Sequence, residues 1–172
     1  LKEKNNFGKN NIGENKKAII EFVSANPTGP LTVGHGRGAI IGDVVSNILH
    51  WNGYKVHREY YYNNAGKQMH RLGLSVKYRY FELLGEKHDF PEDGYEGKYI
   101  IDIAQKLIEE KGSTLLESQD LSLFIKIAEK SIFKDIKNTL EKININFDNY
   151  FNEQSLYDSG ALELVLKKLE NK

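Results

Sequence analysis

The chain has 172 residues, with 24 basic and 24 acidic side chains and no cysteine. This length suits one domain or one and a half, and the lack of cysteine excludes disulfides and thiolate metal sites and is compatible with a reducing cytoplasm. The net charge is zero and no apolar run approaches the ~20 residues that cross a bilayer, so we expect any RNA-binding face to be a local patch and expect no membrane association.

Residues 1–17 are rich in Asn, Lys and Gly, with five Lys against two Glu. Segments of such low hydrophobicity bury too little apolar surface to offset the entropy lost on ordering. The sequence therefore predicts a flexible junction here, and its composition is more typical of a solvated linker than of an RNA contact.

Residues 18–52 have the pattern of a strand, a turn and a helix. The strand contains an apolar run typical of a central parallel strand covered on both faces, namely Ile19, Ile20, Phe22 and Val23. After Gly34, helical spacing predicts a long helix that stops at Gly53, with apolar positions at Ile41, Val44, Val45, Ile48 and Leu49. A strand that leads through a glycine-rich turn into a helix directs backbone N–H groups and the positive helix end at one place. That place favours an anion, such as a phosphate.

The turn between the predicted strand and helix carries candidate binding residues. Gly34 and Gly36 have no Cβ, so a flat or charged ligand can approach the backbone closely. His35 lies between them, and its imidazole can hydrogen-bond a phosphate or a leaving group. Glycine spacing alone is a weak signal for a nucleotide site, and a single histidine is more often structural than catalytic.

Glu21 places a carboxylate in an otherwise apolar strand, where burial is costly unless the charge is paired or hydrogen-bonded. One interpretation is that Glu21 lies at the strand end and faces water or pairs with a nearby lysine. The other is that it binds a cationic ligand at the carboxyl end of the strand, where open α/β sheets place their sites. Ser24 and Asn26 follow at alternate positions and would add polar contacts from the same side.

The remainder of the chain is predicted to be mostly helical. Residues 54–63 are aromatic and β-branched, which predicts a second strand parallel to the first. Helices are expected from Ala65 or Gly66 to Gly85, near 98–111 and over 120–142, followed by a short strand at 145–151 and a last helix from Asp158 or Ser159 to Leu169. The expected inward residues of the three middle helices are Met69, Leu72, Val76, Tyr80 and Leu83; Ile101, Ala104, Leu107 and Ile108; and Phe124, Ile127, Ala128, Ile132, Ile136, Leu140 and Ile143.

Residues 21–39, EFVSANPTGPLTVGHGRGA, resemble the signature stretch of the arginyl-tRNA synthetases, a family of class I aminoacyl-tRNA synthetases. Within this stretch TVGH, at 32–35, resembles the family's His-x-Gly-His ATP motif. YYYNNAGKQ, at 60–68, resembles the stretch that follows the first helix and second strand in that family. The pattern from YEGKYI at 95–100 through residues 146–169 resembles the family's insertion in the catalytic domain. The resemblance runs from about Lys17 to the C-terminus.

Two positions depart from the family's pattern. Thr32 stands at the first histidine of the ATP motif; its hydroxyl can hydrogen-bond, but it cannot carry an imidazolium charge. Asn64 stands where an Asn-Asp-Ala-Gly stretch has aspartate. Asn63 and Asn64 are therefore interpreted as structural residues.

The resemblance implies an α/β fold with a Rossmann-like parallel sheet, the first half of a class I synthetase catalytic domain, and a mostly helical insertion. The expected division is a flexible junction at 1–17, the first Rossmann half at 18–90 and a largely helical insertion at 91–172 that ends before the second Rossmann half. Neither a lysine-bearing triphosphate loop nor an all-helical anticodon-binding domain follows Leu169. We therefore expect the isolated chain to be inactive alone.

The function implied by the resemblance is ATP-dependent activation of arginine to arginyl-adenylate and its transfer to tRNA-Arg by the full-length enzyme. Mg²⁺ would accompany ATP, held by phosphates and water, with no metal site of the protein's own. The full-length enzyme is expected to be a cytoplasmic monomer of protein biosynthesis, with His35 and Thr32 as its catalytic residues. The implied binding residues are Thr32, Gly34, His35 and Gly36 for ATP, and Glu21, Ser24 and Asn26 for arginine.

Two other classes of function stay open. Another nucleotidyl-transferring enzyme with a Gly-His phosphate-binding turn would keep His35 and lose the arginine specificity; the continuous EFVSANPTGP run argues against it. A non-enzymatic RNA-binding module, using the aromatic strand and the basic start of the following helix, would bind RNA in a salt-sensitive way without any effect of ATP. The zero net charge argues against that module.

Overall fold

The computed structural model describes residues 4–118 and 120–170. Contacts between Cα atoms divide the chain into two compact units. The first unit holds the described residues of 1–25, 31–62 and 138–172, and the second holds those of 26–30 and 63–137. These units interleave along the chain, whereas the division expected from sequence is consecutive and stays a prediction.

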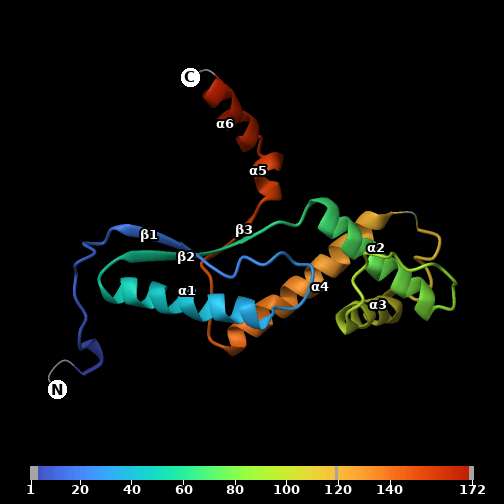
Figure 1. Ribbon diagram of the computed structural model, residues 1–172, viewed down its shortest axis with the longest axis horizontal. Helices are drawn as coiled ribbons and strands as arrows, with labels where there is room; N and C mark the ends of the chain where they lie inside the picture. The colour runs from blue at the N-terminus through green and yellow to red at the C-terminus, as the bar shows by residue number, and fades with distance from the viewer. Residues whose placement is uncertain (1–3, 119, 171–172) are drawn as a thin grey trace. The chain divides into compact units, whose positions relative to one another are not determined.

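The first unit contains a parallel sheet of three strands in the order β1-β2-β3 (Figure 1). The strands are β1 (Lys17–Glu21), β2 (Lys55–Tyr62) and β3 (Asn149–Asn152), and helix α1 (Val33–Trp51) connects β1 to β2. In the register, Ile19 lies opposite His57 on β2, and Tyr60 lies opposite Tyr150 on β3. The predicted α/β class, the parallel sheet and the strand–helix–strand crossover are confirmed.

The prediction that the first strand is central and covered on both faces is wrong for the described sheet. Strand β1 is an edge strand, because its one neighbour is β2. The side chain of Ile19 is 66% exposed, whereas Phe22, just beyond the strand, is 8% exposed. An aliphatic run indicates a strand, but the number of neighbouring strands depends on the rest of the sheet.

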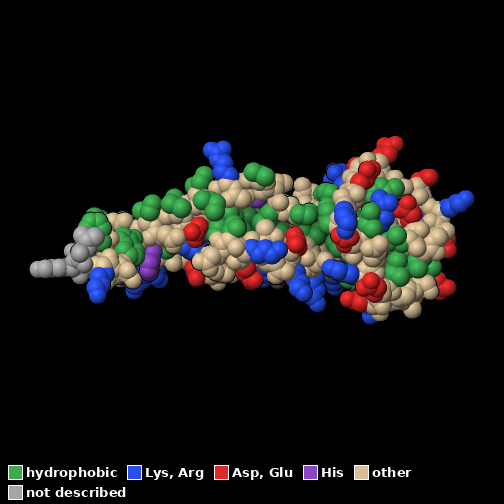
Figure 2. All heavy atoms as spheres, turned by 90° about the horizontal axis from the view of Figure 1, so that it is seen from below, with side chains coloured by type: hydrophobic (Ala, Val, Ile, Leu, Met, Phe, Trp, Pro, Cys, Tyr) green, Lys and Arg blue, Asp and Glu red, His purple; other side chains and the backbone are tan. Residues whose placement is uncertain are grey.

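Helix α1 packs on the sheet through small residues. Its buried residues are Ala39, Gly42 and Ser46, and a Cβ atom added at Gly42 would lie 2.2 Å from the ring of Phe22. The large aliphatic residues lie at the surface with 40–55% exposure; they are Ile40, Ile41, Val44, Val45 and Ile48. Figure 2 shows hydrophobic side chains on the surface toward the left, where Figure 1 places α1. The predicted helix is therefore confirmed, but its larger apolar side chains do not face the sheet.

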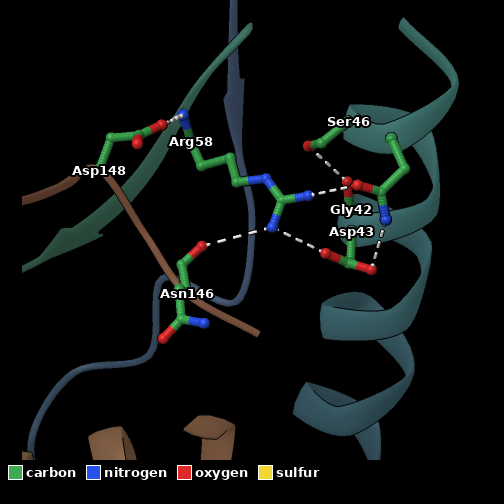
Figure 3. A network of polar contacts seen from close by, with 7 residues as sticks. Gly42, Asp43, Ser46, Arg58, Asn146 and Asp148 are labelled. Atoms are coloured by element: carbon green, nitrogen blue, oxygen red, sulfur yellow. Dashed lines mark hydrogen bonds and ion pairs between the residues drawn. The ribbon is translucent and has the colours of Figure 1, made fainter. Parts of the chain in front are cut away.

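Arg58 on β2 connects three segments of the first unit (Figure 3). Its guanidinium forms an ion pair with Asp43 at 2.8 Å and donates to Asn47 Oδ1 at 2.7 Å, both on α1. It also reaches the carbonyl oxygen of Asn146 at 3.5 Å, and the Arg58 backbone N–H donates to Asp148 Oδ2 at 2.8 Å. These contacts hold α1, β2 and the segment before β3 together.

The segment predicted as a flexible junction is hydrogen-bonded to the end of α1. A short 3₁₀ turn, Lys4–Asn6, opens the described chain. Further along, Gly13 N–H donates to the Asn52 carbonyl at 2.7 Å, and Asn15 N–H donates to the Gly53 carbonyl at 2.9 Å. These bonds place the second half of the junction alongside the turn that leads into β2.

The chain after β3 forms two helices where one was predicted. Helix α5 (Gln154–Asp158) and helix α6 (Ala161–Glu170) are separated at Gly160, whose φ of 68° lies in the left-handed region that favours glycine. Neither helix has a buried residue, and Leu169 is 63% exposed. The predicted short strand at 145–151 is also shifted, because β3 begins only at Asn149.

The second unit is helical. It contains α2 (Gly66–Leu83), α3 (Lys98–Lys111) and the part of α4 (Leu121–Lys142) up to residue 137. Its main buried apolar residues are Met69, Leu72, Val76, Tyr80, Phe81, Ile100, Ile103, Ala104, Leu107, Phe124, Ala128, Ile132 and Ile136. On α3 the inward face includes Ile100 and Ile103 in place of the predicted Ile101 and Ile108, and at the end of α2 the predicted Leu83 is 40% exposed. Among the described helices, none combines the length and apolar character needed to cross a membrane.

Candidate functional site

Thr32 and His35 form a capping box at the start of α1. Thr32 is the N-cap residue, with extended φ and ψ of −92° and 169°. Its Oγ1 accepts from the His35 backbone N–H at 3.4 Å, and His35 Nδ1 accepts from the Thr32 backbone N–H at 3.0 Å. Thr32 Oγ1 also lies 3.2 Å from His35 Nδ1. The two predicted catalytic residues are thus in direct contact, and each satisfies a backbone N–H that the helix start would otherwise leave unpaired.

The glycines beside His35 face open space. A Cβ atom added at Gly36 would have no neighbour within 4 Å, and one added at Gly34 would meet only Thr32 Oγ1, at 3.6 Å. Neither glycine has a positive φ. The packing and backbone of the chain therefore do not require glycine at these positions, which supports the interpretation that a ligand approaches the backbone there.

Glu21 and Ser24 lie at the carboxyl end of β1. Ser24 Oγ donates to Glu21 Oε1 at 2.8 Å and accepts from the Tyr61 backbone N–H at 3.2 Å. Glu21 is exposed and forms no ion pair with a lysine among the described residues. Its carboxylate is therefore oriented by one hydrogen bond and open to a cation. Glu21 is the last residue of β1 and is exposed, as the first interpretation predicts, but its pairing with a lysine is not observed among the described residues; binding of a cationic ligand stays a prediction.

The backbone between Glu21 and Ala25 is bent sharply. Val23 and Ser24 have positive φ values of 65° and 44°, which residues other than glycine rarely adopt. Buried Tyr60 holds this bend, because its hydroxyl donates to the Ala25 carbonyl at 2.8 Å and accepts from the Ala25 N–H at 3.1 Å. Burial raises the pKa of the Tyr60 phenol, so the phenol stays neutral. Sequence reasoning missed Tyr60, although period-two alternation along β2 indicated inward side chains there.

Asn26 belongs to the second unit, and both ends of its amide are used there. Asn26 Oδ1 accepts from the Asn63 backbone N–H at 2.9 Å, and Nδ2 donates to Gln68 Oε1 at 3.1 Å. In the same unit, Tyr99 donates its hydroxyl to the Thr28 carbonyl at 2.8 Å, and burial raises the pKa of Tyr99 to about 12. The structure brings Glu21 and Ser24 together; an arginine contact at Asn26 stays a prediction.

Asn63 and Asn64 have structural contacts. Asn63 Oδ1 accepts from the Ala65 N–H at 2.8 Å, two residues ahead. Asn64 Nδ2 donates to Glu129 Oε1 at 2.8 Å, while Asn64 Oδ1 is buried without a partner among the described residues. An amide at position 64 can donate to Glu129, which an ionised aspartate cannot do. This pairing gives a physical reason for asparagine at a position where the family pattern has aspartate.

Two cavities lined by described residues of the second unit contain no predicted site residue. One, of about 380 Å³, is lined by charged and aromatic side chains that include Arg79, His88 and Phe90. The other, of about 270 Å³, lies between α3 and α4 and includes Lys106 and Lys130. The described residues contain no group of three or more His, Asp or Glu side chains placed to hold a metal ion.

Comparison with known proteins gives a consistent result. A family described as tRNA synthetases class I (R), catalytic domain, matches residues 1–172. An arginine–tRNA ligase of Desulfotalea psychrophila is 54% identical over 167 residues, and the match covers 97% of this chain and 30% of that protein. An arginine–tRNA ligase of Prosthecochloris aestuarii is 53% identical over 160 residues, covering 93% of this chain and 29% of that protein. The chain thus spans about 30% of the length of these curated relatives.

Solved structures agree with this family. The crystal structure of an arginyl-tRNA synthetase from Campylobacter jejuni matches with a TM-score of 0.89 and 37% identity, over 99% of this chain and 38% of that one. The arginyl-tRNA synthetase of Thermus thermophilus matches with a TM-score of 0.58 and 20% identity, over 91% of this chain and 26% of that one. The first match supports a close relationship, and the second supports the fold alone.

Proposed function

The chain belongs to the family of class I tRNA synthetases (R), catalytic domain, and on this premise we propose that it is the part of an arginine–tRNA ligase that begins the catalytic domain. The full-length enzyme activates arginine with ATP and transfers it to tRNA-Arg. The observation that carries this proposal is the open space at the start of α1, where Gly34 and Gly36 have no side chain and leave room beside His35.

ATP binds at the start of α1. The unpaired N–H groups and the positive end of a helix attract phosphate, and the missing Cβ atoms of Gly34 and Gly36 let the nucleotide lie against the backbone. His35 hydrogen-bonds a phosphate oxygen and stabilises the charge that develops during adenylate formation. Thr32, at the same helix start, contributes to the site through its contact with His35. Mg²⁺ enters with ATP, held by phosphates and water.

Arginine binds at the carboxyl end of β1. The Glu21 carboxylate, held by Ser24 at 2.8 Å, accepts a charge-assisted hydrogen bond from the guanidinium or the α-ammonium group of arginine. Ser24 adds a polar contact. A site built from such groups rejects analogues that lack the matching donors, because its own polar groups would then stay unpaired.

The reaction proceeds in two steps. A carboxylate oxygen of arginine attacks the α-phosphorus of ATP; the new C–O–P bond forms as the bond to the β-phosphate breaks, and pyrophosphate leaves. A ribose hydroxyl at the 3′ end of tRNA-Arg then attacks the carbonyl carbon of arginyl-adenylate; the ester bond forms as the bond from that carbon to the phosphate oxygen breaks, AMP leaves, and the hydroxyl proton passes to AMP or to water. The protein contributes by positioning the reactants and stabilising charge. We expect the 172-residue chain alone to charge no tRNA.

The test is arginine-dependent charging of tRNA-Arg by the full-length protein, with wild type beside Glu21→Gln and His35→Ala. We expect Glu21→Gln to raise KM for arginine about 10- to 100-fold, because a charge-assisted hydrogen bond is lost. We expect His35→Ala to lower kcat about 100- to 1,000-fold with a small effect on KM for arginine. If wild type charges no arginine, the proposed function is wrong; if both variants charge normally, the residue roles are wrong.

The assembly and location of the full-length protein are also proposals. We propose a monomer that works in the cytoplasm. Light scattering on the purified full-length protein at micromolar concentration tests the first point, and a dimer mass would overturn it. Cell fractionation tests the second.

A further inference from the structure

We propose that Thr32 is a positioning residue that holds the His35 ring in a single tautomer, with the proton on Nε2 directed at a phosphate oxygen of the nucleotide. The identity of the acceptor rests on the proposed function; the tautomer does not. In this role Thr32 acts through His35. Its hydroxyl contacts the His35 ring and backbone and does not contact the ligand.

The tautomer follows from the chemistry of the donor. The Thr32 backbone N–H can only donate a hydrogen bond, and it donates to His35 Nδ1 at 3.0 Å. Nδ1 must therefore carry a lone pair. A neutral imidazole has one proton, so the proton of His35 is on Nε2. The hydrogen-bond partner of one ring nitrogen thus sets the state of the other.

The Thr32 hydroxyl supports the same state. Its Oγ1 accepts from the His35 backbone N–H at 3.4 Å, which leaves the hydroxyl proton free to point at Nδ1, 3.2 Å away. Two donors then converge on Nδ1. The opposite tautomer, with the proton on Nδ1, would set that hydrogen against the Thr32 N–H. Thr32 and His35 are therefore joined by reciprocal contacts that occupy Nδ1, and Nε2 is the imidazole nitrogen that these contacts leave unused.

Nε2 is available to a ligand. It has no hydrogen-bond partner among the described residues, and His35 is half-buried, so the ring has a fixed side and an open side. The space beside it is open, because Cβ atoms at Gly36 and Gly38 would meet nothing within 4 Å. At the positive end of a helix the favoured acceptor is an anionic oxygen. A neutral Nε2–H donor can stay bound to that oxygen while charge builds up on it.

Long-range ¹H–¹⁵N correlation spectra of the ¹⁵N-histidine-labelled chain test the tautomer directly. The chain has five histidines, and a His35→Gln spectrum assigns the signal of His35. At neutral pH we expect His35 to have an unprotonated Nδ1 and a protonated Nε2 in wild type and in Thr32→Ser, which keeps the hydroxyl. Thr32→Val keeps the shape and the backbone N–H donor and removes only the hydroxyl, so we expect the Nε2-protonated tautomer to remain the major one while the share of the Nδ1-protonated tautomer rises. The control Thr114→Val removes a hydroxyl that donates to the Lys111 carbonyl in the other unit and should leave His35 unchanged.

Charging by the full-length protein gives the second readout. We expect Thr32→Val to lower kcat about tenfold with KM for arginine unchanged, the equivalent of one hydrogen bond, and Thr32→Ser to restore it. A wild-type His35 with its proton on Nδ1 would overturn the inference, even if Thr32→Val failed to fold. Unchanged tautomer and charging in Thr32→Val would overturn the role of the hydroxyl. A wild type that has the expected tautomer but charges no arginine would refute the proposed function and leave the tautomer standing.

Discussion

Two glycines of α1 are expected to respond to alanine in opposite ways. At Gly36 an added Cβ meets nothing within 4 Å, so the helix gains stability because alanine loses less backbone entropy than glycine, about 0.5–1 kcal/mol. At Gly42 the added Cβ would lie 2.2 Å from Phe22 Cγ and 2.5 Å from Phe22 Cβ. Phe22 is 8% exposed, so its ring has little room to move.

The gain in helix stability is common to both variants. The difference between their free energies of unfolding therefore measures the cost of crowding at Phe22. Overpacking in a core costs about 1–3 kcal/mol, and Gly42→Ala should be less stable than Gly36→Ala by that amount. Urea unfolding measures it: the midpoints should separate while the slopes stay equal. Equal midpoints would refute the account of how α1 packs on the sheet.

The same pair of variants separates folding from ligand binding. Because only the ligand needs the space at Gly36, the full-length Gly36→Ala protein should be the more stable variant and yet have a raised KM for ATP. A Gly36→Ala protein that is stabilised and charges arginine with an unchanged KM for ATP would show that no ligand approaches this part of the backbone.

Three other changes have expected outcomes. Asn64→Asp should lower the free energy of unfolding, measured by urea denaturation, by about 1.5–3 kcal/mol, because the amide donor to Glu129 is replaced by a like charge. Adding Glu129→Gln should restore much of the lost stability. A double-mutant cycle of Asp43→Ala and Arg58→Ala should give a coupling of about 1–3 kcal/mol, since the paired side chains are 23% and 21% exposed; no coupling would refute the linking role of Arg58. The hydrogen bond from Tyr61 to Glu153 raises the pKa of Tyr61 from 10.0 to about 12, so its stabilisation is complete below pH 10 and is lost as pH rises toward 12; Tyr61→Phe should show a smaller fall in stability over that range.

Local periodicity predicts α1, β2 and the helices of the second unit well, because each depends on neighbours within a few turns of chain. The inward face of α1 could not be predicted in the same way. The helix has two faces that satisfy helical spacing, one of large aliphatic residues and one of Ala39, Gly42 and Ser46. The small face packs on the sheet because the ring of Phe22 fills the space above Gly42, a contact between residues twenty positions apart.

The pairing of β3 with β2 was equally beyond local signals. Asn149 is separated from Glu59 by 90 positions, and the two are joined by the sheet register and by a hydrogen bond of 3.0 Å from Asn149 Nδ2 to Glu59 Oε2. The alternating pattern of residues 145–151 predicted a strand, but nothing near this segment in the sequence indicates which strand it joins. The capping box at the start of α1 could have been predicted from local sequence, because Thr32 lies only three residues before His35. The signal was missed because histidine replaces the usual Glu or Gln at the third helical position.

Under the proposed function, the candidate site takes two substrates of opposite charge. Glu21 is an exposed carboxylate whose described partner is the neutral Ser24, so it offers a full negative charge at the end of β1. The start of α1 offers N–H groups and the positive helix end, which favour an anion. A nucleotide alone would use the second group and gain nothing from the first. An amino acid with an uncharged side chain would offer the carboxylate its α-ammonium group alone, whereas arginine adds a planar guanidinium that carboxylates bind in a bidentate way. Replacing Glu21 should therefore affect the use of arginine far more than the use of ATP, and an equal loss in both would place this carboxylate in another role.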